Sequence, residues 1–163
     1  MKKLLSFLLI FTLITITSTN VSAIERIDAT QTQSYIEYIN DDLYIETIIT
    51  DATPHNNSIS TLAATNTITK TKTDYYKNSN GKVLWSVAVT GTFTYNGSTS
   101  KCISCSHSTT SPGSSWSIKS ATSYKAANYA TASATATYKN STGATQDYTR
   151  TVTLQCSKNG TIS

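Results

Sequence analysis

Charged residues, glycine, proline and cysteine are all scarce in this chain of 163 residues. Only 13% of the residues are charged, against an average nearer ~25%, and there are 6 glycines and 2 prolines. This composition excludes a coiled coil, a collagen and a chain kept disordered by charge or proline. The sequence also lacks a glycine-rich phosphate loop and the HExxH, GxSxG and paired-carboxylate motifs. We therefore expect no enzyme and no cofactor.

Hydroxyl side chains are abundant instead, since 31 threonines and 23 serines make up a third of the chain. Threonine, isoleucine, valine and the ten tyrosines favour strands, because β-branched and aromatic side chains fit a pleated, half-buried surface. Segments with a two-residue period follow one another from Asn66 onward, separated by turn signals. We therefore expect an all-β fold, namely an antiparallel β-sandwich of about seven strands that is immunoglobulin-like or barrel-like.

The start of the chain has the pattern of a secretory signal peptide. A basic Met1-Lys2-Lys3 precedes an apolar run from Leu4 to Ile16, and Val21 and Ala23 are the small residues of a cleavage site. The apolar run is shorter than the roughly 20 residues that span a bilayer. The pattern predicts a secreted, extracellular protein that begins at Ile24 and is not stably inserted in a membrane.

Three segments follow from this pattern and from the charge: a signal peptide at 1–23, an acidic leader and linker at 24–60, and a Ser/Thr-rich β domain at 61–163. Residues 24–51 hold seven acids and one base, whereas residues 52–163 hold two acids and ten bases. The leader is either a solvated acidic segment or a cover that masks the basic domain until it is removed. The bases are dispersed single lysines rather than a dense patch, so we expect no nucleic-acid partner.

The order of apolar residues predicts where the strands lie and which faces they bury. Apolar residues on both sides of Asn40-Asp41-Asp42 predict a short hairpin or two extended segments in the leader. From Trp85 to Phe93 large apolar residues alternate with small or hydroxyl residues, and Gly91 indicates a bulge or a close backbone approach. The alternating alanines at 130–136 need bulky partners, so we expect them to pack against Trp85 or Trp116 across a second sheet.

Part of the basic domain resembles a known group of proteins. The resemblance lies in GKVLWSVAVTGTFTYNG at 81–97, in Lys101-Cys102, and in TVTLQCS at 151–157. The group consists of small secreted proteins of Gram-positive, gut-type Firmicutes, and the similarity covers about residues 60–163. Since the group has no assigned activity, the resemblance implies a secreted location and a β fold. Its two cysteines match Cys102 and Cys156, which makes Cys105 an addition in this chain.

The three cysteines admit three interpretations. Together with His107 they could form a Cys3His zinc set, although a regular strand would place Cys102 and Cys105 on opposite faces. Cys105 and His107 could instead form a nucleophile pair. In an exported protein, a disulfide plus one free thiol is the simplest outcome. We favour a disulfide between Cys102 and Cys156, both of which can point inward near the sheet ends, with Cys105 as the free thiol, no metal and no catalytic residue.

Three classes of function remain. We favour a secreted, non-enzymatic interaction module that contacts a cell-surface or extracellular polymer or protein through exposed hydroxyl and tyrosine side chains. A carbohydrate-binding module is the first alternative, with aromatic rings that stack on sugars. The candidate stacking residues are Tyr75, Tyr76, Trp116, Tyr124 and Tyr129. A membrane-active or antibacterial protein with the leader as a cover is the second, because residues 128–156 alternate small and polar side chains as a pore-lining hairpin does.

Overall fold

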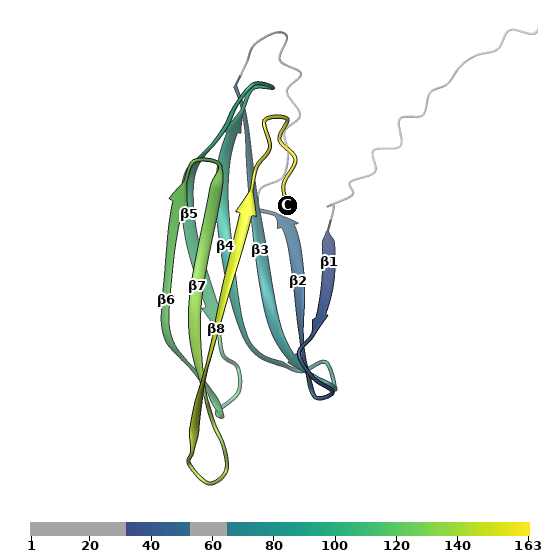
Figure 1. The fold of residues 1–163 in the computed structure, drawn as a ribbon, viewed down its shortest axis with the longest axis vertical. Helices are drawn as coiled ribbons and strands as arrows, with labels where there is room; N and C mark the ends of the chain where they lie inside the picture. The colour runs from purple at the N-terminus through teal and green to yellow at the C-terminus, as the bar shows by residue number, and fades with distance from the viewer. Residues whose placement is uncertain (1–31, 53–64) are drawn as a thin grey trace, which may run out of the picture.

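The computed structural model describes residues 32–52 and 65–163, which form eight antiparallel strands in two sheets (Figure 1). The strands are β1 (Gln33–Tyr38), β2 (Leu43–Asp51), β3 (Asn66–Asn78), β4 (Val83–Tyr95), β5 (Ser100–Thr110), β6 (Trp116–Ala126), β7 (Tyr129–Lys139) and β8 (Thr145–Gln155). The larger sheet has the order β1-β2-β3-β4-β5, and the smaller has the order β6-β7-β8. The predicted antiparallel β-sandwich is confirmed, as two separate sheets rather than one sheet closed on itself. No described residue belongs to a helix that could span a membrane.

The hairpin predicted in the acidic leader is present and forms part of the larger sheet. Strand β2 pairs with β1 on one side and with β3 on the other, from Leu43 opposite Asn78 to Asp51 opposite Lys70. Its apolar side chains reach the core, where Ile45 and Ile49 are buried. Strand β2 of the leader is therefore a structural element of the sandwich, and β1 is an exposed strand at its edge. The predicted signal peptide and the boundary near residue 60 lie outside the described residues.

The core lies between the two sheets, on the faces that the two-residue period predicts. Trp85 and Phe93 of β4 are fully buried, and the alternating alanines of β7 face this strand from the smaller sheet. A Cβ added to Gly91 would lie 2.6 Å from a ring carbon of Phe93 and 2.8 Å from the Cβ of Ala130. Gly91 therefore marks a close backbone approach. Trp116 lies in the same sheet as the alanines, so only Trp85 can face them from the opposite sheet.

The two ends of the core differ in chemistry. At one end the ring of Tyr76 stacks on Trp85 at 5.0 Å between centroids, and Trp116 lies 5.1 Å from both Tyr138 and Tyr148. At the other end the core is aliphatic and sulfur-rich, with Leu154, Cys102 and Cys156 buried beside Phe93. Packing in one half therefore depends on ring contacts and in the other on close aliphatic contacts.

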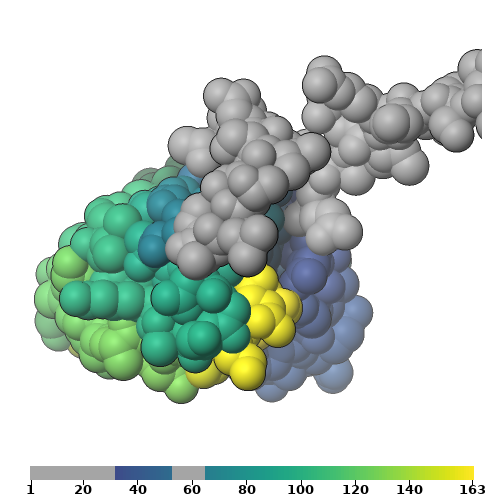
Figure 2. Space-filling view, turned by 90° about the horizontal axis from the view of Figure 1, so that it is seen from above, coloured from purple at the N-terminus to yellow at the C-terminus, as the bar shows by residue number. Residues whose placement is uncertain are grey.

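The C-terminal residues fold back over the cysteine end of the core. Ile162 forms an isolated bridge with Cys156, and the N–H of Gly97 donates to the carbonyl of Lys158 at 2.8 Å. Seen from above, these residues lie between the β4–β5 end of the sandwich and the N-terminal hairpin (Figure 2). The chain end therefore closes this end of the sandwich.

Candidate functional site: a polar groove and hydroxyl-covered faces

A polar groove opens where the larger sheet extends beyond the smaller one. The first three strands form its floor and β8 forms its wall, enclosing a volume of about 220 Å³. The lining residues are Tyr35, Ile36, Glu37, Thr47, Lys72, Asp74, Arg150, Thr151, Val152 and Thr153. The smaller sheet has three strands and the larger has five, so the smaller sheet does not cover the inner face of β1 to β3 completely. Polar side chains occupy the part that stays uncovered.

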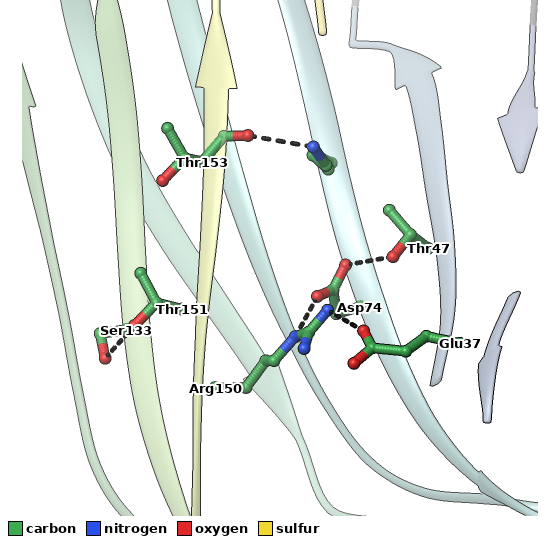
Figure 3. A network of polar contacts seen from close by, with 8 residues as sticks. Glu37, Thr47, Asp74, Ser133, Arg150, Thr151 and Thr153 are labelled. Carbon is green, nitrogen blue, oxygen red and sulfur yellow. Dashed lines mark hydrogen bonds and ion pairs between the residues drawn. The ribbon is translucent and has the colours of Figure 1, made fainter. Parts of the chain in front are cut away.

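A charged network centred on Arg150 crosses this groove (Figure 3). The Nε of Arg150 donates to Asp74 at 2.6 Å, and its Nη2 donates to Glu37 at 2.9 Å. The hydroxyl of Thr47 donates to the second oxygen of Asp74 at 2.7 Å. Asp74 is only 3% exposed, so these bonds satisfy a buried carboxylate. The network connects β8 of the smaller sheet to β1, β2 and β3 of the larger one.

The electrostatics of the groove keep its arginine charged. Burial alone would lower the pKa of Arg150, but the hydrogen bonds and charges of Asp74 and Glu37 outweigh it and raise the pKa. Lys72 donates one hydrogen bond, to the carbonyl of Thr153 at 3.2 Å. Tyr35, which is 56% exposed, borders the groove. An aromatic ring beside hydrogen-bond donors and acceptors suits an uncharged, hydroxyl-bearing ligand.

The outer face of the larger sheet carries hydroxyl groups in register across its strands. One row consists of Thr50, Thr71, Thr90 and Ser106, and the next consists of Thr69, Thr92 and Ser104. The hydroxyls of Thr71 and Thr90 lie 2.8 Å apart, and those of Thr69 and Thr92 lie 3.1 Å apart. Strand geometry spaces the backbone positions that carry these side chains by about 4.8 Å across the strands and about 6.7 Å along them.

The outer face of the smaller sheet repeats this arrangement. Thr131 and Thr153 lie 3.1 Å apart between hydroxyl oxygens, and Thr135 and Thr149 lie 2.9 Å apart. The row between them pairs Ser133 with Thr151 at 3.1 Å. The hydroxyl residues that dominate the composition are therefore organised as ladders on both outer faces.

The five predicted stacking residues do not form one site. Tyr76 and Trp116 are each only 8% exposed because they belong to the aromatic end of the core, so the prediction is wrong for these two. Tyr75 is half-buried on the outer face of the larger sheet. Tyr124, at 61%, and Tyr129, at 39%, are exposed on the outer face of the smaller sheet, near the β6–β7 turn. Tyr76 and Trp116 meet inside the core, and of the exposed rings only Tyr124 and Tyr129 lie at neighbouring positions on one face.

The groove and the exposed tyrosines of the hairpin were missed by sequence reasoning. Tyr38, which is 77% exposed, lies beside Tyr44 with 5.9 Å between ring centroids. A signal for the groove was present, because Arg150 occupies a position of β8 where the period predicts an apolar residue between Tyr148 and Val152. An arginine at a core-facing position requires a buried acid nearby.

The structure corrects the predicted orientation of Cys105. The pairing of β4 with β5 shifts from Phe93 opposite Cys102 to Thr92 opposite Ser104, which leaves Ile103 in a β-bulge. Because the bulge adds one residue, Cys102 and Cys105 both face the core. Cys105 is half-buried there, with its sulfur 3.7 Å from the carbonyl oxygen of Thr131 on the opposite sheet.

Cys102 and Cys156 lie on either side of the β6–β7 turn. Their backbone N–H groups donate to the consecutive carbonyls of Ala127 and Asn128, at 2.8 and 3.0 Å. Burial raises the pKa of both thiols. The three cysteines are not bonded to one another in this structure. The Cys102–Cys156 disulfide therefore stays a prediction, as does the free thiol of Cys105.

The zinc and nucleophile interpretations also depend on His107. Its ring is exposed, and its Nδ1 lies 3.0 Å from the hydroxyl of Ser123. Within residues 32–52 and 65–163, no group of three or more His, Cys, Asp or Glu side chains is placed to hold a metal ion. The geometry thus offers no support for a zinc set that includes Cys102, Cys105 and Cys156.

Comparison of the chain with protein-family models, with curated proteins and with solved structures finds no match. The chain's own residues are therefore the basis for a proposal about function. The features that bear on it are the groove beside β8 and the two hydroxyl-covered faces.

Proposed function

We propose that the protein is a secreted, non-enzymatic interaction module that contacts a cell-surface polymer or protein. The observation that carries this proposal is the set of hydroxyl rows on the outer face of the larger sheet, above all the row from Thr50 to Ser106 across four strands. Evenly spaced donors and acceptors with few charges fit a partner that repeats hydroxyl or amide groups. Such a face has no need of a deep pocket.

The energetics favour a polymer over a small molecule. When two threonine hydroxyls bond to each other, as Thr71 and Thr90 do, one donor and several acceptor positions remain for a partner. A single neutral hydrogen bond contributes only about 0.5–1.5 kcal/mol net. Useful affinity therefore requires many such contacts at once, and a long repeating partner provides them.

A binding assay on insoluble material tests this proposal. The protein is incubated with purified Gram-positive cell walls and with insoluble polysaccharides, and the bound fraction is measured by sedimentation. Replacing Thr69, Thr71 and Thr90 together by valine keeps the β-branched shape and removes the hydroxyls, so the fold is retained. We expect binding to weaken at least several-fold. The control carries Thr135→Val and Thr149→Val on the other sheet, and equal binding by wild type and the triple variant would contradict the proposal.

Secretion forms part of the proposal and has its own test. N-terminal sequencing of protein recovered from the medium of producing cells should begin at Ile24. Intact Met1 in the medium would contradict the export argument.

Carbohydrate binding through exposed aromatics is the second candidate, and the neighbouring pair Tyr124 and Tyr129 favours it. Tyr124 is 61% exposed on a hydroxyl-lined face, where its ring can stack on a sugar while hydroxyls contact the sugar edge. Glycan-array binding should fall for Tyr124→Ala and not for Tyr38→Ala, which removes an exposed ring from the other sheet. An equal loss for both variants would argue against a site at Tyr124.

The membrane-active alternative depends on the alternation in residues 128–156. In the sandwich the alanines at 130, 132, 134 and 136 lie in the core, facing the larger sheet. The opposite side of the same strands carries the threonine ladder. The described part of the leader pairs edge to edge with β3 within the larger sheet and does not lie across the faces of the other strands. Packing between two sheets therefore accounts for the alternation without a pore.

A further inference from the structure

Among the described strands, four lie at sheet edges, and three of these carry features that discourage pairing with another chain. Edge strands expose unpaired N–H and C=O groups, and proteins block them with bulges, lysines, prolines or inward-pointing charges. Strand β5 has the bulge at Ile103 and Lys101, and β6 has a register shift beside Lys119. Strand β8 carries the inward-pointing Arg150.

Strand β1 has only one of these features, Glu37, which points to the groove side and whose charge is paired with Arg150. Its sequence from Gln33 to Tyr38 contains no lysine, arginine or proline, and its pairing with β2 has no register shift. All six of its residues are exposed, with Ile36 at 56% and Tyr38 at 77%. No described residue pairs with its outer edge, and it is the outermost strand of the larger sheet (Figure 1).

We propose that β1 pairs antiparallel with β1 of a second copy of this chain, so that a two-fold dimer joins the two larger sheets into one. With the symmetry axis at Ile36, each Ile36 lies opposite its counterpart and Ser34 lies opposite Tyr38. On the other face, Tyr35 lies opposite Glu37. Such an interface is isologous, with the same patch contributed by both copies.

The residues of β1 complement themselves in this register. Ser34, Ile36 and Tyr38 lie on the outer face of the sheet, and the two-fold axis perpendicular to the sheet keeps them there. The aliphatic pair at the axis buries surface that is exposed in the single chain. Glu37 is the only charged residue of the strand, so no like charges meet. This complementarity favours a second copy over an unrelated partner.

The dimer also changes the groove. Tyr35 and Glu37 of β1 line the groove of each copy, so the pairing places two grooves side by side over one continuous floor. The β8 strands of the two copies then form the outer walls. Because the ladder has only six residues per copy, we expect a dissociation constant in the micromolar range rather than an obligate dimer.

Sedimentation equilibrium of the purified protein over about 1 to about 500 µM tests the pairing. Wild type should pass from monomer to dimer within this range. Ile36→Lys and Ile36→Glu should each stay monomeric, because like charges then meet at the axis. An equimolar mixture of the two variants should recover the dimer, since opposite charges now face each other. Ile103→Lys, a charge placed on an exposed isoleucine of the bulged edge, is the matched control and should dimerise like wild type.

Three results would contradict the pairing of β1 with its counterpart. A wild-type monomer at every concentration would overturn the proposal, and so would a dimer that survives Ile36→Lys. A mixture that fails to recover the dimer would overturn the register through Ile36. Circular dichroism and melting curves establish that each variant folds, as expected for a position that is already 56% exposed. The oligomeric state is measured without any binding to cell-surface material, so its failure is distinct from a failure of the proposed function.

Discussion

The N-terminal hairpin and the strands that follow it are held in one fold by different forces. The later strands bury large apolar side chains such as Trp85, Phe93 and Leu154 completely. The hairpin buries two isoleucines and one threonine, Ile45, Ile49 and Thr47. Besides the backbone ladder between β2 and β3, it is attached through ion pairs, in which its acids Glu37, Glu46 and Asp51 contact Arg150, Lys77 and Lys70. The uneven distribution of charge along the sequence is thus a docking pattern, with an acidic hairpin placed against basic strands.

This difference has a thermodynamic consequence. Salt screens partly exposed ion pairs and weakens them, whereas it does not screen contacts between uncharged apolar side chains. Regions with few buried apolar contacts open locally before the whole domain unfolds. We therefore expect amide hydrogens of β2 to exchange faster than those of β4. The substitutions below should increase or reverse this difference in exchange rate.

The largest effect on stability is expected from substitution of the buried cysteines Cys102 and Cys156. If Cys102 and Cys156 form a disulfide, they close a loop of about 54 residues, which stabilises the domain by roughly 4 kcal/mol in the chain-entropy model. Under oxidising conditions Cys102→Ser or Cys156→Ser should lower the melting temperature strongly. Cys105→Ser should lower it far less and remove the remaining titratable thiol.

Peptide mapping checks the pairing directly. Because the bulge at Ile103 turns Cys105 toward the core, Cys105 is the alternative partner for Cys156. A mapped Cys105–Cys156 bridge with Cys102 free would contradict the predicted pairing.

A smaller and more local effect is expected from the charged network of the groove. Arg150→Met leaves the carboxylate of Asp74, which is 3% exposed, without its cationic partner. An unpaired buried charge is costly, and we expect a loss of about 2–4 kcal/mol in the free energy of unfolding. Hydrogen exchange should accelerate more in β2 than in β4, because the arginine connects the hairpin to β8.

The double variant Arg150→Met with Asp74→Leu provides the control. Since it removes both charges, it should recover a large part of the lost stability. A double variant no more stable than Arg150→Met would show that the network acts through packing rather than charge.

The melting temperature of the reduced protein should also depend on pH. Burial raises the pKa of the Cys102 and Cys156 thiols above the value in the unfolded chain. Their contribution to stability is complete below the unfolded pKa and is lost as the pH rises through the folded pKa. The reduced protein should therefore melt at progressively lower temperature from about pH 8 to about pH 9.5. The Cys102→Ala, Cys156→Ala variant should lack this decline, and an identical decline in it would assign the effect to other groups, such as Tyr76.

The strands and their buried faces could be predicted from sequence, because alternation is a local property. The apolar face from Trp85 to Phe93 and the alanine face of β7 are where the two-residue period placed them. The orientation of Cys105 could not be predicted, since a single bulged residue at Ile103 reverses every later position. A bulge depends on the partner strand, and the sequence of β5 alone does not contain it.

The candidate site was harder to predict than the fold, because it joins distant segments. The contact between Glu37 and Arg150 spans 113 positions of the sequence, and the apparent separation into leader and domain concealed it. The second difficulty was to predict which aromatic side chains are exposed. Tyr75 and Tyr76 are adjacent, yet Tyr76 is core and Tyr75 faces outward, because neighbouring residues of a strand point to opposite faces.

The smallest effect is expected from the ion pair of Lys119 and Asp147, which lies within the smaller sheet and is the exposed counterpart of the hairpin contacts. Hydrogen bonds from Lys119 and Thr137 lower the pKa of Asp147. A lowered carboxyl pKa adds stability above the unfolded pKa, and that stability is lost as the pH falls through the folded value. Asp147→Asn should leave the melting temperature at pH 7 almost unchanged, because exposed pairs are screened by solvent. Nuclear magnetic resonance titration should show the carboxyl pKa rising in Lys119→Met. It should rise less in Thr137→Val, which removes the weaker of the two hydrogen bonds, and an unchanged pKa in both variants would contradict this assignment.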